Sequence, residues 1–175
     1  MDILDKEEKR FYPNGQLEER GNWRLVRNGL RERFYPNGQV NVRENYIDGE
    51  RIGPFESFHE DGQLKFRGNF KDGERDGLSE TFDNNGQLKF RGNFKDGEFD
   101  GVVEWYHKNG QLQGRSNYVD GYENGLSEEF HDNGQLSKRL NYVDDNLDGL
   151  VELFDVDGNL TRTDTYRNGE QVEST

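Results

Sequence analysis

Residues 82–101 read Phe-Asp-Asn-Asn-Gly-Gln-Leu-Lys-Phe-Arg-Gly-Asn-Phe-Lys-Asp-Gly-Glu-Phe-Asp-Gly. This stretch places Asn85-Gly86 and Asp96-Gly97 between short runs that contain aromatic and aliphatic residues. Asn-Gly and Asp-Gly between such runs are the strongest short-range hairpin signals, because Asn, Asp and Gly tolerate the left-handed backbone of tight turns. The stretch therefore predicts consecutive antiparallel strands joined by tight turns.

The Asn/Asp-Gly turn recurs along the chain, at a spacing of 23 residues once and of 24 residues five times. The turn glycines are Gly15, Gly38, Gly62, Gly86, Gly110, Gly134 and Gly158. An aromatic residue lies four positions before each of them: Phe11, Phe34, Phe58, Phe82, Tyr106, Phe130 and Phe154. Such regular spacing is typical of a repeat architecture, so we interpret these glycines and aromatics as structural residues.

Two of the turns contain proline, as Pro13-Asn14-Gly15 and Pro36-Asn37-Gly38. Proline presets the first turn position and glycine then takes a positive φ, which fits a three-residue loop made of a type I turn and a glycine bulge. With this loop Phe82 lies opposite Leu88, and Phe94 has the same parity as Leu88. We therefore expect both aromatics of each repeat on one core face, whereas a two-residue loop would split the apolar residues between the faces.

The apolar residues show no 3.6-residue period over the length of a helix, so almost no helix is expected. The fold class we predict is all-β: an elongated, twisted single antiparallel meander of about seven tandem β-hairpin repeats with a 24-residue period, or roughly 14 strands. Residues 9–169 form one domain in this interpretation. Residues 1–8 are a charged leader and residues 170–175 a C-terminal tail, and charges near both ends can block further strand pairing.

Composition narrows the classes of partner. Of the 175 residues, 29% are hydrophobic and 34% are charged, and the net charge is −13. An acidic field repels phosphate and anionic headgroups, so we expect no nucleic acid and no membrane partner. A basic protein partner is favoured, although the charge can also serve solubility alone.

No cysteine is present, which excludes disulfides and thiolate chemistry. The chain begins without the apolar stretch of a secretory signal, so we expect a cytoplasmic location; a chain trimmed of an export signal would look the same.

Two charged ladders follow the repeat. Glu lies six residues before the turn glycine and Arg five residues after it, each in six repeats: Glu32, Glu56, Glu80, Glu104, Glu128 and Glu152, and Arg20, Arg43, Arg67, Arg91, Arg115 and Arg139. Six equal copies argue against an active site and favour ion pairs worth a few tenths to about 1 kcal/mol each. With one core face, Glu and Arg fall on opposite faces, so we expect other partners for both. Asn also recurs, seven residues after the glycine, and we interpret it as a ladder that bonds loop backbone.

The three histidines, His59, His107 and His131, all lie three residues before a turn glycine. Histidines of adjacent repeats would lie two strand spacings, or about 10 Å, apart, too far to share a metal with Zn–N bonds of about 2 Å. The same slot holds Tyr or Asp in other repeats, so we interpret it as a variable surface stripe. No phosphate loop, nucleophile elbow or HExxH motif is present, and we predict no catalytic, metal or cofactor-binding residues and no cofactor.

The repeats depart from their own consensus in three regions: 23–29, 52–55 and 99–122. Aromatic residues outside the core register are favoured anchors for protein interfaces. We therefore name five candidate partner-binding residues: Phe99, Trp105, Tyr122, His107 and His131. Extra packing at curved points of the sheet is the alternative.

The pattern of residues 82–101 resembles the MORN repeat, and is most similar to the variant in bacterial proteins grouped as YwqK-family antitoxins. The shared features are the aromatic-x-x-Asn-Gly-Gln-Leu segment, a second aromatic and Asp-Gly-x-x-x-Gly, and they extend over about residues 9–169. The resemblance implies a hairpin array and, for the bacterial variant, neutralisation of a toxin. Eukaryotic MORN proteins are often linked to membranes, a role that the net charge of −13 argues against.

The function we expect is that of a non-catalytic binding protein, an antitoxin or immunity-type protein that occludes a partner protein. A structural scaffold that self-associates, as a homodimer for example, is the alternative. A hydrolase is disfavoured, since near-equivalent repeats offer no obviously unique pocket.

Overall fold

The computed structural model of the chain describes residues 7–22 and 26–174. They form two compact units, one up to Gln87 and one from Leu88 onward. The strands of the first unit are β1 (Glu8–Phe11), β2 (Leu17–Asn22), β3 (Asn28–Phe34), β4 (Val40–Ile47), β5 (Glu50–Phe58), β6 (Leu64–Lys71), β7 (Glu74–Arg75) and β8 (Gly77–Phe82). Those of the second are β9 (Leu88–Lys95), β10 (Glu98–Tyr106), β11 (Leu112–Val119), β12 (Tyr122–Phe130), β13 (Leu136–Val143), β14 (Asn146–Leu147), β15 (Gly149–Phe154), β16 (Leu160–Arg167) and β17 (Glu170–Ser174).

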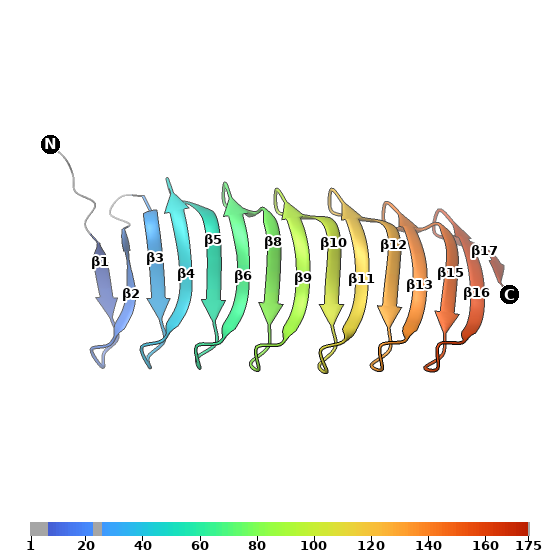
Figure 1. Cartoon of the computed structure of the whole chain (residues 1–175). Helices are drawn as coiled ribbons and strands as arrows, with labels where there is room; N and C mark the ends of the chain where they lie inside the picture. Colours follow the sequence, from blue (N-terminus) through green and yellow to red (C-terminus); the bar gives the residue numbers. More distant parts are fainter. Residues whose placement is uncertain (1–6, 23–25, 175) are drawn as a thin grey trace. The chain divides into compact units, whose positions relative to one another are not determined.

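Within each unit the strands lie side by side in chain order and pair antiparallel with their neighbours (Figure 1). No helix occurs in residues 7–22 and 26–174. The prediction of an all-β antiparallel meander built from hairpin repeats of about 24 residues is confirmed. The number of strands in the described residues is 17 rather than roughly 14. The difference arises because two hairpin arms are interrupted and because residues 170–174 add a strand.

The two interruptions separate β7 from β8 and β14 from β15. They fall at Asp76 and Asp148, whose backbone N–H groups donate to Asn69 O and Asn141 O at 2.9 Å each. The next residue in each case is a glycine with a positive φ, so the chain steps sideways without leaving the sheet. Each pair of short strands therefore acts as one hairpin arm.

Parts of the expected leader and tail belong to the sheet. Residues 1–6 of the leader lie outside the described residues, and Glu8 already begins β1. Trp23 and Leu25, within the shortened first repeat, also lie outside them. Residues 170–174, which we assigned to a tail, pair with β16 as β17.

The turns at the Asn/Asp-Gly glycines have the predicted three-residue loop. In the first repeat, Tyr12 N donates to Gln16 O at 2.8 Å and Gly15 N donates to Tyr12 O at 2.9 Å. The same two bonds close all seven of these turns, and the seven glycines have φ values between 77° and 88°. This is the type I turn with a glycine bulge that the proline-containing turns favoured.

The turns at the other end of the strands have two residues. Asp48 and Gly49 both have positive φ, 49° and 88°, which is the type I′ geometry that suits the twist of a hairpin. In one of these turns the glycine is replaced, and Asp145 adopts a φ of 64°. Its carboxylate oxygen Oδ1 accepts a hydrogen bond from Glu123 N at 2.6 Å. The substitution thus places an extra carboxylate beside β12.

The predicted single core face is wrong, because the hairpins contain a second bulge, as in β1–β2, β3–β4, β5–β6, β10–β11, β12–β13 and β15–β16. Trp105 pairs with Gly114 and Tyr106 pairs with Leu112, so that Gln113 is an extra residue on β11. One extra residue reverses which face the following side chains occupy. The first aromatic of each repeat and the leucine opposite it therefore lie on one face, and the second aromatic lies on the other.

The same bulge brings the Glu and Arg ladders together, which corrects the expectation that they lie on opposite faces. Glu104 lies directly opposite Arg115, and Glu128 directly opposite Arg139. We call the face with these ladders the zipper face. The opposite face, which we call the aromatic face, carries Tyr46, Phe55, Phe66 and Phe70 in the first unit and Phe90, Phe94, Phe99, Trp105, Tyr118 and Tyr142 in the second.

The most buried apolar side chains lie on the aromatic face: Val42, Tyr46 and Phe70 in the first unit and Phe94, Val103, Leu140 and Val151 in the second. Rings cover small residues there. A Cβ atom added to Gly92 would lie 3.0 Å from Cζ of Phe90, which shows that this ring lies against the glycine backbone. A single layer of strands thus buries a core with its own side chains.

Candidate functional site

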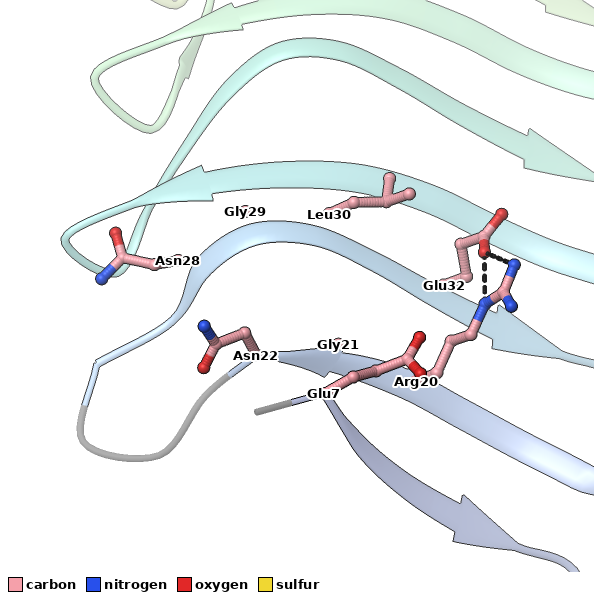
Figure 2. Close-up of a pocket in the computed structure, with 8 residues that line it drawn as sticks. All are labelled: Glu7, Arg20, Gly21, Asn22, Asn28, Gly29, Leu30 and Glu32. Carbon is pink, nitrogen blue, oxygen red and sulfur yellow. Dashed lines mark hydrogen bonds and ion pairs between the residues drawn. The ribbon is translucent and has the colours of Figure 1, made fainter. Parts of the chain in front are cut away.

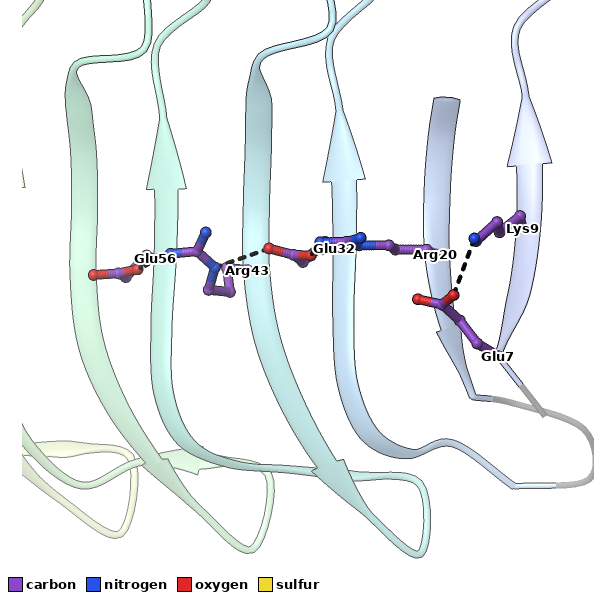
Figure 3. Close-up of polar contacts among 6 residues, drawn as sticks. All are labelled: Glu7, Lys9, Arg20, Glu32, Arg43 and Glu56. Atoms are coloured by element: carbon purple, nitrogen blue, oxygen red, sulfur yellow. Dashed lines mark hydrogen bonds and ion pairs between the residues drawn. The ribbon is translucent and has the colours of Figure 1, made fainter. Parts of the chain in front are cut away.

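The zipper face of the first unit carries a continuous row of ion pairs (Figure 3). Arg20 Nη2 lies 2.5 Å from Glu32 Oε2, and Arg43 bridges Glu32 and Glu56, with Nε 3.0 Å from Glu32 Oε1 and Nη1 3.3 Å from Glu56 Oε2. Burial raises the pKa of Glu32, but hydrogen bonds from Arg43 and Arg20 outweigh burial and leave this pKa below its ordinary value. The row therefore stabilises the sheet with charges that neutralise one another.

The second unit repeats this arrangement. Arg115 pairs with Glu128 at 2.6 Å, and Arg139 pairs with Glu152 at 2.9 Å. Arg139 also lies over the ring of Phe154, 5.9 Å from its centroid, a cation–π distance. The first aromatic of a repeat thus supports an arginine of the preceding repeat. Because each ladder charge has a partner of the opposite sign, the ladder offers no distinct acid or base.

The Asn ladder bonds loop backbone, as expected. Asn69 Nδ2 donates to Asp76 O at 3.1 Å, and Asn141 Nδ2 donates to Asp148 O at 2.7 Å. These bonds hold the segment that leads into each interrupted arm. The Asn side chains are therefore structural.

The histidines connect adjacent repeats. Nε2 of His107 lies 2.8 Å from Phe130 O, and Nε2 of His131 lies 3.1 Å from Phe154 O. In the same slot, Tyr35 Oη donates to Phe58 O at 2.8 Å. The slot is thus a half-buried ladder between turns rather than a variable surface stripe. A partner-binding role for His107 and His131 stays a prediction, and one ring nitrogen of each already faces a backbone carbonyl oxygen.

The other candidate partner-binding residues lie on different faces. Phe99 packs against Phe94 and Tyr118 on the aromatic face, with ring centroids 4.6 and 5.1 Å away. Trp105 lies on the same face, half-buried, whereas Tyr122 is 56% exposed and opposite Val119 on the zipper face. The five residues therefore do not form one patch, and Phe99 and Trp105 are the two that share a surface.

A hollow of about 390 Å³ lies in the second unit, and its lining on the aromatic face combines rings with carboxylates. The rings are Trp105, Tyr118 and Tyr142, and the carboxylates are Glu123 and Glu129. Tyr118 lies directly opposite Glu123 in the pairing of β11 with β12. This hollow is the candidate site.

Small residues form the base of this hollow. Ser116 and Ser127 are buried and paired across β11 and β12, and their hydroxyl oxygens lie 2.7 Å apart. Gly114 lies opposite Glu129 on the same strands. Because these side chains are short, the larger rings and carboxylates around them enclose a depression.

The electrostatics of the hollow are acidic. Burial raises the pKa of both Tyr118 and Tyr142, and the negative charge of Glu123 raises both further. Asp145 adds to the effect on Tyr118, and Glu129 adds to the effect on Tyr142. Two cations of the chain are close, and both are paired: Arg115 lines the hollow and lies 2.6 Å from Glu128, and Lys138 Nζ lies 2.8 Å from Glu129 Oε2. The site therefore favours a positively charged group.

A hollow of about 510 Å³ in the first unit is less suited to a ligand (Figure 2). Its lining includes Arg20 and Glu32, which pair with each other, so their charges cancel. Residues 23–25, which follow its lining residue Asn22, lie outside the described residues.

The zipper face also carries a set of exposed apolar side chains that we did not predict from the sequence. In the second unit they are Val102, Val119, Leu126, Val143 and Leu150, each between 46% and 55% exposed. The signal was present, because most repeats carry an apolar residue directly after the second glycine of the Asp-Gly-x-x-x-Gly segment. These side chains form a second candidate surface.

Within the described residues, no group of three or more His, Asp or Glu side chains is arranged to hold a metal ion. The same residues contain no helix that is long and apolar enough to cross a membrane.

Comparison with known proteins identifies a family. A family model described as MORN repeat variant matches six segments, 4–24, 27–48, 51–72, 75–96, 99–120 and 123–144. No curated protein matches the chain. The seventh hairpin, β15 and β16, lies outside the matched segments but has the same turn and the same register. Repeats of this class generally bind proteins or membranes and are not catalytic. Because the matched segments cover more than half of the chain, it belongs to the MORN repeat variant family.

Proposed function

We propose that this protein is a non-catalytic antitoxin or immunity-type protein that neutralises a basic partner protein by occluding its surface. The observation that carries the proposal is the acidic, ring-lined hollow of the second unit. Tyr and Trp are favoured anchors in protein interfaces, and carboxylates beside them select a positively charged partner.

Two further observations support a binding function. The charges of the zipper face neutralise one another, so the excess of acid, a net charge of −13, resides elsewhere on the chain. Such an excess speeds association with a basic protein by long-range attraction. The likeness of residues 82–101 to the repeats of YwqK-family antitoxins supports the neutralising role in particular.

The test is co-expression with the product of the adjacent gene. We expect the full chain to form a stable complex with a basic toxin-like protein encoded there, to relieve its toxicity, and to bind less tightly as salt is raised. Glu123→Lys should abolish relief, whereas Glu170→Lys, the same charge change at the exposed start of β17, should preserve it. The proposal fails if no complex forms, or if Glu123→Lys relieves toxicity as well as the unmodified chain.

A self-associating scaffold is the second candidate, and the exposed apolar side chains of the zipper face favour it. Contiguous apolar surface is typical of interaction sites. Sedimentation over a range of concentrations distinguishes the two functions. A dimer that weakens in Leu126→Ser would support the scaffold, whereas a strict monomer at all concentrations would exclude it.

A further inference from the structure

The slot two residues after the two-residue turn changes its chemistry along the chain. It holds Arg51 and Arg75 in the first unit, and Phe99, Glu123, Leu147 and Gln171 in the second. The slot lies on the aromatic face: Arg51 pairs with Tyr46, and Glu123 with Tyr118, in equivalent registers. The same backbone position therefore presents a cation in one unit and an anion in the other.

Arg51 shows how this position holds a guanidinium. Its guanidinium carbon lies 4.8 Å from the ring centroid of Phe70, 4.9 Å from that of Phe55 and 5.9 Å from that of Tyr46. Its Nε donates to Glu44 Oε2 at 2.9 Å. Three rings and one carboxylate thus surround a single arginine, at distances typical of cation–π contact.

Around Glu123 two of the three rings remain, Ser127 stands in place of Phe55, and the arginine is absent. Tyr118 and Tyr142 occupy the ring positions that Tyr46 and Phe70 occupy around Arg51, and Trp105 adds a third ring. Among the described residues, no arginine or lysine of the chain lies over these three rings. The position equivalent to Glu44 holds Ser116, and the carboxylate here is that of Glu123, in the slot of Arg51 itself. The second unit therefore keeps two ring positions of the arginine site, has small serines where Glu44 and Phe55 lie, and carries a carboxylate in place of the arginine.

From this comparison we infer that the hollow of the second unit binds an arginine side chain of the partner protein. The inference rests on the proposed function and names the chemical group recognised there. The guanidinium lies against Trp105, Tyr118 and Tyr142, and Glu123 accepts its hydrogen bonds. A volume of about 390 Å³ suffices for one long side chain, since ligand pockets begin at about 300 Å³.

Arginine fits better than lysine for two reasons. A guanidinium is planar and stacks on aromatic faces, and it is more weakly hydrated than an ammonium group, so it enters a ring-lined hollow at lower cost. Glu129 lies at the edge of the same hollow and is already paired with Lys138, which leaves Glu123 as the principal acceptor.

The experiment titrates the full chain with N-acetyl-arginine amide, and with the lysine and citrulline analogues as matched probes. The Trp23→Phe background leaves Trp105 as the only tryptophan, so its indole N–H signal in an NMR spectrum reports on the hollow. We expect saturable shifts, with the arginine probe about threefold tighter than lysine and about tenfold tighter than uncharged citrulline. Equal affinity for arginine and citrulline, or for arginine and lysine, would overturn the inference.

Three variants sharpen the test. Glu123→Gln should weaken binding of the arginine probe about fivefold, while Glu170→Gln, which removes the same charge from an exposed position, should leave it unchanged. Glu123→Arg should fold, since Arg51 and Arg75 occupy this slot elsewhere, and should block the probe by filling the hollow with the chain's own guanidinium. Unchanged probe binding in Glu123→Arg contradicts the inference even if Glu123→Gln were poorly folded.

The outcome can be separated from that of the proposed function. If the arginine probe fails to bind but a complex with the adjacent gene product forms, the arginine site is wrong and the antitoxin proposal stands. If the probe binds and no such complex forms, the site stands and the antitoxin proposal fails.

Discussion

Two nitrogens of Arg51 contact one carboxylate oxygen of Glu44: Nε and Nη2 lie 2.9 and 2.8 Å from Oε2. The Glu44 side chain has no exposed surface. A second arginine, Arg31, lies 2.6 Å from the other carboxylate oxygen of Glu44. A carboxylate buried on the aromatic face is therefore neutralised from two sides.

We expect Glu44→Gln to lower the free energy of unfolding by roughly 3 kcal/mol, because removing one partner of a buried ion pair leaves uncompensated charge. Urea denaturation followed by circular dichroism measures the change. Glu56→Gln removes a carboxylate that is 36% exposed and should cost at most about 1 kcal/mol. Equal losses in the two variants would show that the Glu44 network contributes no more than a surface pair.

Acidification should destabilise the protein partly through Glu32. Its pKa is lowered in the folded protein from an ordinary value of 4.5, so its contribution to stability is present above about pH 4.5 and is lost as the pH falls through the folded value. The stability difference between the unmodified chain and Glu32→Gln should therefore be largest near neutral pH and should shrink in acid. A difference that does not vary with pH would contradict this assignment.

Gly92 should not tolerate a side chain. An added Cβ would lie 3.0 Å from Phe90 Cζ and 3.4 Å from Val103 Cγ1, which leaves no room without moving the ring. We expect Gly92→Ala to cost roughly 1–3 kcal/mol in the free energy of unfolding, as overpacking does. Adding Phe90→Leu should recover part of that loss in a double-mutant cycle, and strictly additive losses would argue against contact between the two residues.

The phenol groups of the hollow should respond to Glu123. Burial and the charge of Glu123 both raise the pKa of Tyr118 and Tyr142. Glu123→Gln should therefore lower both values towards the ordinary pKa of 10.0, and NMR titration of the tyrosine rings measures them. In Glu170→Gln the two pKa values should stay as they are; a fall there too would point to net charge rather than proximity.

The turns and the repeat could be predicted from sequence because they depend on local chemistry. The turn glycine, Gly15 in the first repeat, recurs in every repeat, and Pro13 and Pro36 indicate the loop type in the first two. The arrangement of the faces could not, because it depends on the extra residue Gln113. In other repeats this position holds residues such as Lys65 or Ser137, and none of these types marks a bulge.

The candidate site was only partly accessible from sequence. Phe99 and Trp105 stood out because they depart from the consensus, and both lie on the aromatic face. Glu123 did not stand out, since one more Glu in an acidic chain has no special meaning. Its meaning emerges only when the structure shows that Arg51 occupies the equivalent place among rings.

The interchange of Arg51 and Glu123 at one backbone position has a consequence for how such arrays acquire specificity. In a hairpin with an arginine in this slot, the arginine side chain of the chain itself occupies the site. A single substitution of that arginine leaves the site free for an arginine of another protein. Arg75→Glu would then create a second arginine-binding site in the first unit, and Glu123→Arg would block the site in the second unit. In this architecture one substitution per hairpin can therefore add or remove a binding site, while the sheet stays the same.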